Sequence, residues 1–440
     1  MNKRARNATI VVCAAAVSVA AFLGAFRCGA LFRVSKEDRI LILAPHPDDE
    51  TLGAGGVIQR AVKAGARVKV VCVTKGRMSL IARGARDLSS ADVLEHGERR
   101  GRETVAAMAL AGLAREDIIF LGYPDAGLSE ILTEHWNKDF PYTSPVTVTA
   151  KVLYPDALSP DAALIGQNIL KDLKTIIRDF RPTKIFVPHP ADTHRDHRAV
   201  YVFLKVALFD LAGQIPPPSV FPFPVHFAAW PPASLDTGRE LEEPARFRNT
   251  RFWWKRLWLT KEEVRTKLAM INSYQSELVD DPFSLTVFCK QNELFGDYPE
   301  LFITGRGTKA RIVTSNVIDS VRYARKAGFL VMTLSLNTHA AEAQRPEPLY
   351  FDLILLGYSR AADFASMPKI HVIIGQDGVL VRDKNATVRD HGIEVDCAKT
   401  ITIRIPLAAL HDPDYVFNCL QIFDMSSYFD ATAWRVLRLK

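Results

Sequence analysis

The chain has 440 residues and a mass of 49.0 kDa, which is more than one ordinary hydrophobic core holds and indicates at least two folded units. Hydrophobic residues make up 48% of the chain and charged residues 24%, a balance that excludes an intrinsically disordered protein. The formal net charge of +7 suggests a nucleic-acid partner, but five basic residues and no acidic one fall within residues 1–33, so the remainder carries only +2. With no RNA- or DNA-binding motif beside that small charge, we expect no nucleic-acid partner.

The first feature in chain order is an apolar N-terminal run. Residues 8–26 contain no charged side chain and lie between Arg6 and Arg27. As an α-helix this run would be roughly 28 Å long, close to the hydrocarbon thickness of a bilayer. The basic residues that precede it would keep the N-terminus in the cytoplasm and place the body on the other side of the membrane. A cleaved signal peptide is the alternative, so we expect residues 1–33 to anchor or export the protein.

Strand-like and helical segments alternate after this run. The buried strand-like runs are residues 39–44, 67–74, 118–121 and 184–187, and the helical segments between and after them are residues 51–64, 95–113, 164–180 and 198–211. This alternation predicts βαβ units in an α/β domain over residues 34–305, with a Rossmann-like, doubly wound and mostly parallel sheet. Ligands of such sheets bind beyond the carboxyl ends of the strands.

The remainder of the chain changes character twice. Residues 214–232 are rich in proline, and a helix over residues 260–277 follows, starting from a capping box of Thr260 and Glu263. The short β-rich runs after that are residues 329–336, 349–356, 370–374, 393–396 and 400–405. Several short strands between turn residues predict an all-β sandwich, so we expect an accessory domain over residues 306–440. It would bind carbohydrate or only pack against the first domain, because a fold alone does not establish a function.

Two clusters of histidine and carboxylate side chains follow two of the predicted strands. Directly after residue 44 the sequence reads PHPDDE, and after residue 187 it reads PHPADTHRDH. Burying so many polar groups at the mouth of an apolar strand is unfavourable unless a cation or hydrogen bonds compensate them. Acidic residues alone would suit a helix N-terminus, but that explanation leaves the histidines unaccounted for. Parallel strands end at the same edge of a sheet, so we expect the two clusters to meet.

A catalytic zinc ion takes three nitrogen or oxygen ligands from the protein and keeps one position open for water. His46 and Asp49 of the first cluster and His197 of the second provide such a set. Because this set also accepts other divalent ions, Fe²⁺ stays an alternative to Zn²⁺.

The remaining members of the clusters suit proton transfer and positioning. Asp48 is free to accept a proton from water, and His194 could act as an acid or stabilise an oxyanion. Asp196 could orient a neighbouring imidazole, as carboxylates around metal sites do. We therefore predict Asp48, His194 and Asp196 as catalytic residues.

The run APHPDDETLGAGG, followed much later by PHPADTHRDHR, resembles the PIG-L/LmbE-like superfamily, which includes N-acetylglucosaminyl-phosphatidylinositol de-N-acetylase. Weaker similarities are an R-x-x-E helix at Arg100, the segment LGYPD at residues 121–125, a closing helix at residues 267–275 and the stretch NELF at residues 292–295. The resemblance implies the same three metal ligands, Asp48 as general base and His194 as the electrophilic partner.

Candidate substrate contacts are less specific. Arg77 and Asp125 lie at presumed strand ends, and with Asp192 of the second cluster they are our candidates for binding sugar hydroxyls. His226, in the proline-rich segment, could reach the site or simply pack near Trp230.

Together these features predict a zinc-dependent hydrolase that removes an acetyl group from an N-acetylglucosamine-type sugar or glycoconjugate. Two alternatives remain. One is an amidase of the same fold that cleaves a larger sugar-amide conjugate, and the other is a surface protein that binds glycans without cleaving them. The joint presence of ligands, base and electrophile favours an enzyme.

Overall fold

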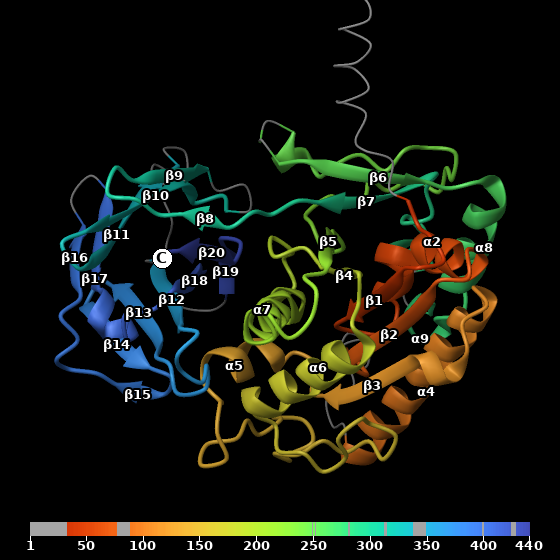
Figure 1. The fold of residues 1–440 in the computed structure, drawn as a ribbon, viewed down its shortest axis with the longest axis horizontal. Coiled ribbons are helices and arrows are strands. Elements are labelled where there is room, and N and C mark those ends of the chain that lie inside the picture. Colours follow the sequence, from red (N-terminus) through yellow and green to blue (C-terminus); the bar gives the residue numbers. More distant parts are fainter. Residues whose placement is uncertain are drawn as a thin grey trace, which may run out of the picture.

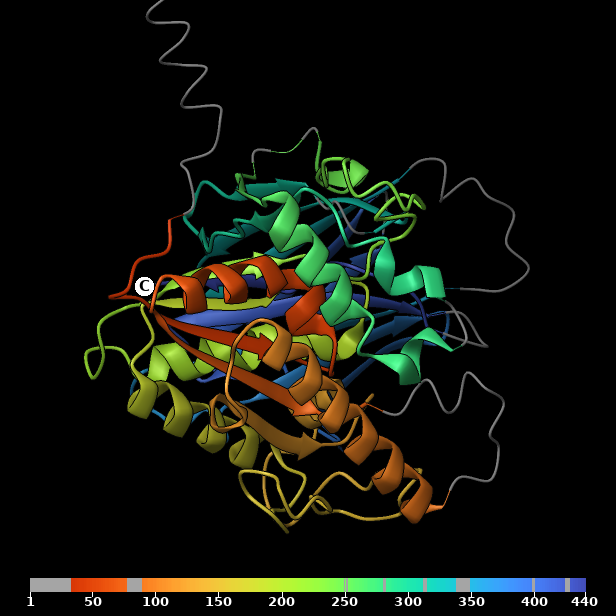
Figure 2. The same cartoon turned by 90° about the vertical axis from the view of Figure 1, so that its right-hand side faces the viewer.

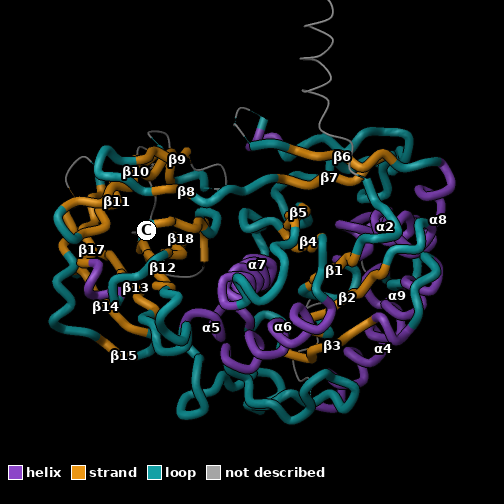
Figure 3. Tube along the Cα trace, in the orientation of Figure 1, coloured by secondary structure: helices purple, strands orange, loops and turns teal. Residues whose placement is uncertain are grey.

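The computed structural model describes residues 33–76, 89–248, 250, 252–279, 282–311, 315–337, 349–397, 400–423 and 428–440. An α/β half and a half made of antiparallel sheets lie side by side (Figure 1). Helices gather in the first half, and strands dominate the second (Figure 3).

The α/β half is built on one sheet of five parallel strands. These are β1 (Arg39–Ala44), β2 (Arg67–Thr74), β3 (Ile118–Tyr123), β4 (Lys184–Pro188) and β5 (Ser219–Phe223), in the order β3-β2-β1-β4-β5. Strands β1, β2 and β3 follow one another toward one edge of the sheet. Strand β4 then pairs with the other side of β1, and β5 continues toward the opposite edge. The order therefore reverses between β1 and β4, and such a reversal opens a crevice at the carboxyl ends of the two strands.

Helices cover both faces of this sheet because its strands are apolar on both sides. Ile40 and Ile42 belong to the core on one face, and Leu41 and Leu43 to the core on the other, as the two-residue period of a strand requires. The first face is covered by α2 (Asp49–Lys63), α4 (Ser90–Leu110) and α8 (Lys261–Ile271), which pack together in Figure 2. The second face is covered by α5 (Leu128–Thr133), α6 (Gly166–Phe180) and α7 (Arg195–Asp210).

A β-ribbon and short helices complete this half. The ribbon pairs β6 (Trp254–Trp258) with β7 (Asn292–Gly296), and the short helices are α9 (Gln275–Leu278) and α10 (Pro282–Thr286), with the 3-10 turns η1 (Arg115–Asp117) and η2 (Ala245–Phe247). The predicted helix over residues 260–277 is thus split into α8 and α9. Its predicted capping box at Thr260 is confirmed, since the Thr260 hydroxyl accepts from the Glu263 amide at 3.2 Å.

Two sheets form the C-terminal half, and their strands pair antiparallel except for β20 and β8, which pair in parallel. One has the order β16-β17-β11-β10-β9, and the other β15-β14-β13-β12-β18-β20-β8, with β19 paired to β18. Their bounds are β8 (Leu301–Phe302), β9 (Thr308–Arg311), β10 (Ile318–Lys326), β11 (Phe329–Leu336), β12 (Tyr350–Tyr358), β13 (Lys369–Gly375), β14 (Gly378–Asp383), β15 (Ala386–Thr387), β16 (Glu394–Cys397), β17 (Ile401–Pro406), β18 (Tyr415–Phe423), β19 (Tyr428–Ala431) and β20 (Arg435–Arg438), with the 3-10 turn η3 (Leu407–Leu410). Inward-facing residues of both sheets share one apolar core. The predicted fold class, a parallel α/β sheet followed by an all-β unit, is confirmed.

The outer face of the larger antiparallel sheet packs against the α/β half. Tyr358, Phe417 and Trp434 from this sheet belong to the same apolar core as the residues of α7. Hydrogen bonds add to the apolar contact between the two halves. The Arg198 guanidinium donates to the Thr432 carbonyl, and the Trp434 amide donates to the Pro190 carbonyl at 3.1 Å. The second histidine cluster therefore lies on a segment that touches the C-terminal half on one side.

This shared core predicts that the C-terminal half is needed for folding of the first. A chain ended after Gly305 would leave one face of α7 uncovered, and each large apolar side chain that loses its burial costs about 1.5–3 kcal/mol. We expect such a chain to aggregate or to lose cooperative thermal unfolding, as followed by circular dichroism and size-exclusion chromatography. A monomeric truncated chain with a sharp thermal transition would contradict this expectation.

The expectation of a membrane location is corrected. Within the ranges that the structure describes, no helix combines the length and the apolar character needed to cross a bilayer. This finding contradicts the expected anchored or exported location, and it gives no support to the membrane as a partner. Residues 8–26, from which that expectation came, lie outside the described residues.

Candidate metal and active site

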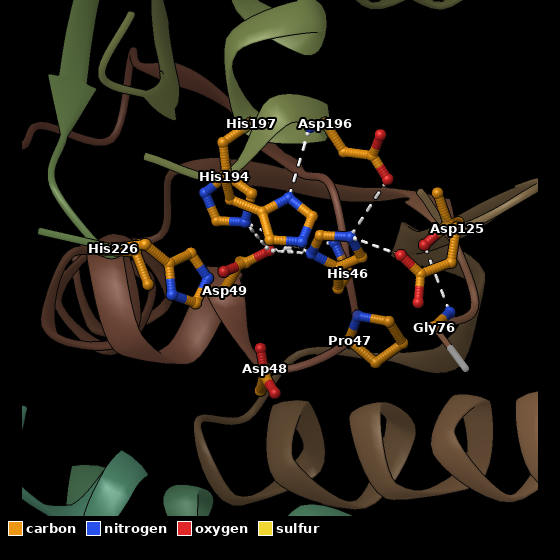
Figure 4. A network of polar contacts seen from close by, with 12 residues as sticks. His46, Pro47, Asp48, Asp49, Gly76, Asp125, His194, Asp196, His197 and His226 are labelled. Atoms are coloured by element: carbon orange, nitrogen blue, oxygen red, sulfur yellow. Dashed lines mark hydrogen bonds and ion pairs between the residues drawn. The ribbon is translucent and has the colours of Figure 1, made fainter. Parts of the chain in front are cut away.

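The first cluster follows β1 and forms the start of α2. Asp48 has φ 111° and ψ −35°, a left-handed backbone conformation that residues other than glycine rarely adopt. Its carbonyl accepts from the Thr51 and Leu52 amides, both at 2.9 Å, which holds this turn in place. Strain of this kind collects at functional sites, where the surrounding structure maintains it. The turn separates the side chains of Asp48 and Asp49, which point to different neighbours (Figure 4).

Three atoms of the predicted ligands converge on one point. Nδ1 of His46, Oδ2 of Asp49 and Nε2 of His197 are each 3.2 Å from the other two. Tetrahedral zinc with ligands at about 2.0–2.2 Å places those ligands roughly 3.3–3.6 Å apart, so the triangle is close to the size that zinc requires. Figure 4 shows the three side chains pointing toward one another, and they come from the loop after β1 (His46), the first residue of α2 (Asp49) and the first turn of α7 (His197).

The outer nitrogens of the two histidines face carboxylates. Nδ1 of His197 lies 3.2 Å from Oδ2 of Asp192, and Nε2 of His46 lies 3.2 Å from Oδ1 of Asp125 and 3.4 Å from Oδ2 of Asp196. Carboxylates at these positions keep the proton on the outer nitrogen, so both inner nitrogens present lone pairs. Two lone pairs and a carboxylate oxygen repel one another unless a cation lies between them. The donor set therefore fits a divalent metal.

The electrostatics of the triangle agree with this arrangement. Burial alone would lower the pKa of His197, but Asp49 and Asp192 outweigh it and raise that pKa to about 9. Burial would raise the pKa of Asp49, yet the charges and hydrogen bonds of His197 and His46 hold it well below its usual range. A positive charge is thus strongly favoured at this point, whether it comes from a proton or from a metal ion.

Asp48 lies beside the triangle and faces Arg100 of α4. Its Oδ2 is 3.1 Å from a guanidinium nitrogen of Arg100, which also donates to the Pro47 carbonyl at 2.6 Å and lies 3.2 Å from Glu277. Burial raises the pKa of Asp48 well above its ordinary value, although Arg100 acts in the opposite direction. A carboxylate with a raised pKa is a better proton acceptor at neutral pH than an ordinary aspartate.

Two further histidines border the triangle. Nδ1 of His194 accepts from the Asp196 amide at 3.3 Å, which leaves Nε2 to carry the proton of the neutral ring. Burial, together with the charges of His46 and His197, lowers the pKa of His194 to about 2, so this ring is neutral and donates a hydrogen bond without charge. The ring centroid of His226 lies 4.6 Å from that of His197. His194 forms a possible three-ligand group with His46 and His197, and His226 forms one with Asp49 and His197, because one donor atom from each residue of a group lies within 4.8 Å of the others.

A cavity of about 770 Å³ opens over these residues. Its polar lining residues are His46, Asp48, Arg100, Asp125, Thr193, His194, His226, Glu277 and Ser284. Its apolar lining residues are Leu52, Val225, Phe227, Ala228, Ala229, Trp230, Pro231, Ala233, Phe283, Leu285, Val287 and Phe288. The cavity thus offers both hydrogen-bonding groups and aromatic ring surfaces, the two kinds of contact that a sugar ring makes.

The predicted substrate contacts differ in their positions. Asp125 lines the cavity, whereas Arg77 lies outside the described residues. Asp192 is 1% exposed and does not line the cavity among the residues described. Its oxygens accept from the amides of His194 and His226 at 2.8 and 3.0 Å and face His197. We therefore propose that Asp192 orients His197 in place of its predicted contact with the substrate.

Two residues of the site, His226 and Glu277, were not among the predicted site residues. His226 borders the triangle and lines the cavity, so of its two expected positions it takes the one at the site. Its position follows from β5, whose course brings the proline-rich segment back over the carboxyl end of β4. Glu277 reaches the cavity from α9, far from both clusters in the sequence. No local pattern marks this residue, because only the packing of α9 on α4 brings it near Arg100.

Comparison with known proteins identifies a family domain within the chain. The sequence pattern of the family described as PIG-L: GlcNAc-PI de-N-acetylase matches residues 41–208, which contain β1 to β4 and both clusters. Residues 41–208 form a PIG-L family domain. The resemblance drawn from the two cluster motifs is thereby confirmed.

Curated relatives match part of the chain. A 1D-myo-inositol 2-acetamido-2-deoxy-α-D-glucopyranoside deacetylase of Kineococcus radiotolerans is 27% identical over 187 residues, 42% of this chain and 48% of the relative. A deacetylase described by the same name, from Saccharopolyspora erythraea, is 32% identical over 169 residues, 36% of this chain and 50% of the relative. The chain spans about half the length of the curated relatives it matches.

Solved structures are also similar to part of the chain. One is the N,N'-diacetylchitobiose deacetylase from Pyrococcus horikoshii, at 20% identity over 61% of this chain and 87% of that chain, with a TM-score of 0.35. Another is a conserved protein from Thermus thermophilus, at 20% identity over 59% of this chain and 93% of that chain, with a TM-score of 0.36.

Proposed function

We propose that this protein is a metal-dependent hydrolase that removes the acetyl group from an N-acetylglucosamine-type sugar or glycoconjugate. The observation that carries the proposal is the triangle of His46, Asp49 and His197, with ligand atoms 3.2 Å apart and Asp48 beside it. The PIG-L domain and the names of the curated relatives, which are sugar deacetylases, support the same reaction.

Zinc is the metal that we propose, held by His46, Asp49 and His197. When bound there, zinc would polarise the amide carbonyl and lower the pKa of the attacking water toward about 7, so that Asp48 could remove its proton at neutral pH. The Fe²⁺ ion would suit the same donor set, and metal analysis of the purified protein distinguishes the two.

The side chains of this chain would move the protons of the reaction. Asp48 accepts the proton of the attacking water as its oxygen forms a bond with the carbonyl carbon. His194, neutral and with its proton on Nε2, donates a hydrogen bond to the developing oxyanion. The carbon–nitrogen bond then breaks, and the proton held by Asp48 passes to the departing amine. One water and one acetamide thus give acetate and a free amino sugar.

The walls of the cavity would bind the sugar. Asp125 is the candidate for a hydroxyl group of the sugar, because its carboxylate lines the cavity next to His46. Trp230 and Phe288 also line the cavity and supply flat apolar surface, on which the apolar face of a sugar ring can stack. We propose residues 34–305 as the catalytic unit and residues 306–440 as an accessory β-sandwich that supports it.

Product analysis tests this function. Zinc-loaded protein is incubated with N-acetylglucosamine, with its short oligomers and with N-acetylglucosaminides that carry inositol or apolar groups. We expect release of acetate and the free amine in equal amounts from at least one of them. Release of a larger acid from an N-acyl sugar, with no acetate from any N-acetyl sugar, would favour an amidase for larger conjugates. Binding of these sugars without any product would overturn the enzymatic proposal.

A further inference from the structure

Helix α2, which begins with Asp49, is interrupted within its first two turns. Ala54 has φ −144° and ψ 16°, far from helical values, so the segment splits into a short first part and a longer second part. Residues 49–58 are all buried. An interruption here leaves backbone amides and carbonyls without their helical partners, and buried groups of this kind must find others.

A buried ion pair supplies these partners. In a continuous helix the Gly56 amide would donate to the Leu52 carbonyl. Here the Gly56 amide donates to Oε1 of Glu293 at 2.6 Å, and the Leu52 carbonyl accepts from Nζ of Lys267 at 2.9 Å. The two side chains are themselves joined, with Nζ of Lys267 2.7 Å from Oε1 of Glu293. The ion pair is therefore inserted into one hydrogen bond of the helix.

The second oxygen of Glu293 extends this arrangement. Oε2 accepts from the Val57 amide at 3.0 Å, so one carboxylate satisfies two successive amides at the start of the second part of α2. Lys267 comes from α8 and Glu293 from β7, so two separate elements meet at the interruption. Both side chains are 1% exposed, which keeps water from replacing either of them.

The glycines of the run LGAGG make room for this packing. A Cβ atom at Gly56 would collide with Leu259 and lie 3.2 Å from the carboxylate of Glu293. A Cβ atom at Gly53 would collide with the ring of Phe223 on β5. The first part of α2 is also tied to the segment after α8, where the Tyr274 hydroxyl donates to Glu50 and lies 3.0 Å from the Thr51 hydroxyl.

A buried ion pair is a poor way to gain stability, because desolvation of the two charges offsets most of their attraction. The ion pair instead fixes the angle between the two parts of α2. The first part begins with Asp49, and Asp48 directly precedes it. We propose that Lys267 and Glu293 are positioning residues of the metal site, which hold the first turn of α2 so that Asp49 meets His46 and His197. This inference rests on the proposed metal-dependent function and assigns a role to the NELF stretch and the closing helix.

The test compares variants of the full chain by zinc binding. Lys267→Met and Glu293→Gln each remove one charge with little change in volume. The matched control is Arg60→Met, because Arg60 and Glu263 form another ion pair between α2 and α8, 2.6 Å long and beyond the interruption. Each protein is stripped with a chelator, titrated with Zn²⁺ by calorimetry and melted without metal. Co²⁺ substitution then reports ligand geometry through visible absorption.

We expect the zinc Kd to rise about 10- to 100-fold in Lys267→Met and Glu293→Gln, the range seen when residues around metal ligands are lost. Their Co²⁺ absorption should also change, whereas Arg60→Met keeps both the Kd and the spectrum. If Lys267→Met does not fold, the comparison with the control relies on Glu293→Gln, which is the milder change. Unchanged zinc affinity and Co²⁺ spectrum in a folded variant would overturn this inference alone. A wild-type chain that binds no divalent ion would overturn the proposed function and this inference with it.

Discussion

Replacing His197 with alanine is expected to release the metal and to lower kcat/KM by about 10³-fold or more. A metal supplies several kcal/mol of transition-state stabilisation, and each ~1.4 kcal/mol is a factor of ten in rate. His197 provides one corner of the triangle, with Nε2 3.2 Å from both other ligand atoms, so its loss leaves only two ligands. Metal content by mass spectrometry and acetate release at saturating zinc measure the two effects.

The control for this variant removes another buried histidine. His371 is paired with Asp352 at 2.9 Å within the larger antiparallel sheet, away from the cavity. His371→Ala should lower the melting temperature while one metal ion per chain is retained. If His197→Ala kept stoichiometric metal in a folded chain, the assignment of the three ligands would be wrong.

Replacing Asp48 with asparagine is expected to lower kcat by about 10²–10⁴-fold, the usual contribution of a general base, while metal binding persists. The amide cannot accept a proton from water, but it has the same shape and asparagine is among the residues that tolerate a positive φ. The hydrogen bond from Arg100 can persist to the amide oxygen, so the turn should stay intact. Steady-state kinetics and metal analysis on the same preparation measure both properties.

Asp49→Asn provides the contrast to this result. Asp49 offers its Oδ2 atom to the triangle, so this variant should lose metal and activity together. If Asp48→Asn lost the metal and Asp49→Asn kept it, the roles of ligand and base would be exchanged. If Asp48→Asn kept full activity, a different group would have to accept the proton.

The sequence allowed prediction of the sheet and of the meeting of the two clusters. Apolar runs such as residues 39–44 are long and bounded by polar residues, so their strand character is a local property. Strands β1 and β4 pair in parallel, so both end at the same edge of the sheet. The two clusters that follow these strands are therefore neighbours. That pairing brings His46 and His197 together, whereas the choice between Asp48 and Asp49 depends on the left-handed turn at Asp48, which turns Asp49 toward the two histidines.

Features that depend on distant packing could not be predicted in the same way. Strand β5 was missed because Pro222 lies within it, which an edge strand tolerates but local propensity disfavours. The interruption of α2 at Ala54 leaves buried backbone groups without helical partners. Lys267 and Glu293, more than 200 residues away, supply those partners. The core shared by α7 and the larger antiparallel sheet joins segments with no sequence signal in common.

The most direct test of the account is the metal dependence of deacetylation by the intact chain. Chelator-stripped protein is titrated with zinc while acetate and free amine are measured from the best N-acetylglucosamine substrate of the panel. We expect no measurable product without metal, a linear rise in rate up to one zinc ion per chain, and equal amounts of acetate and amine. Full activity in stripped protein, or a rise that is the same in His197→Ala, would contradict it.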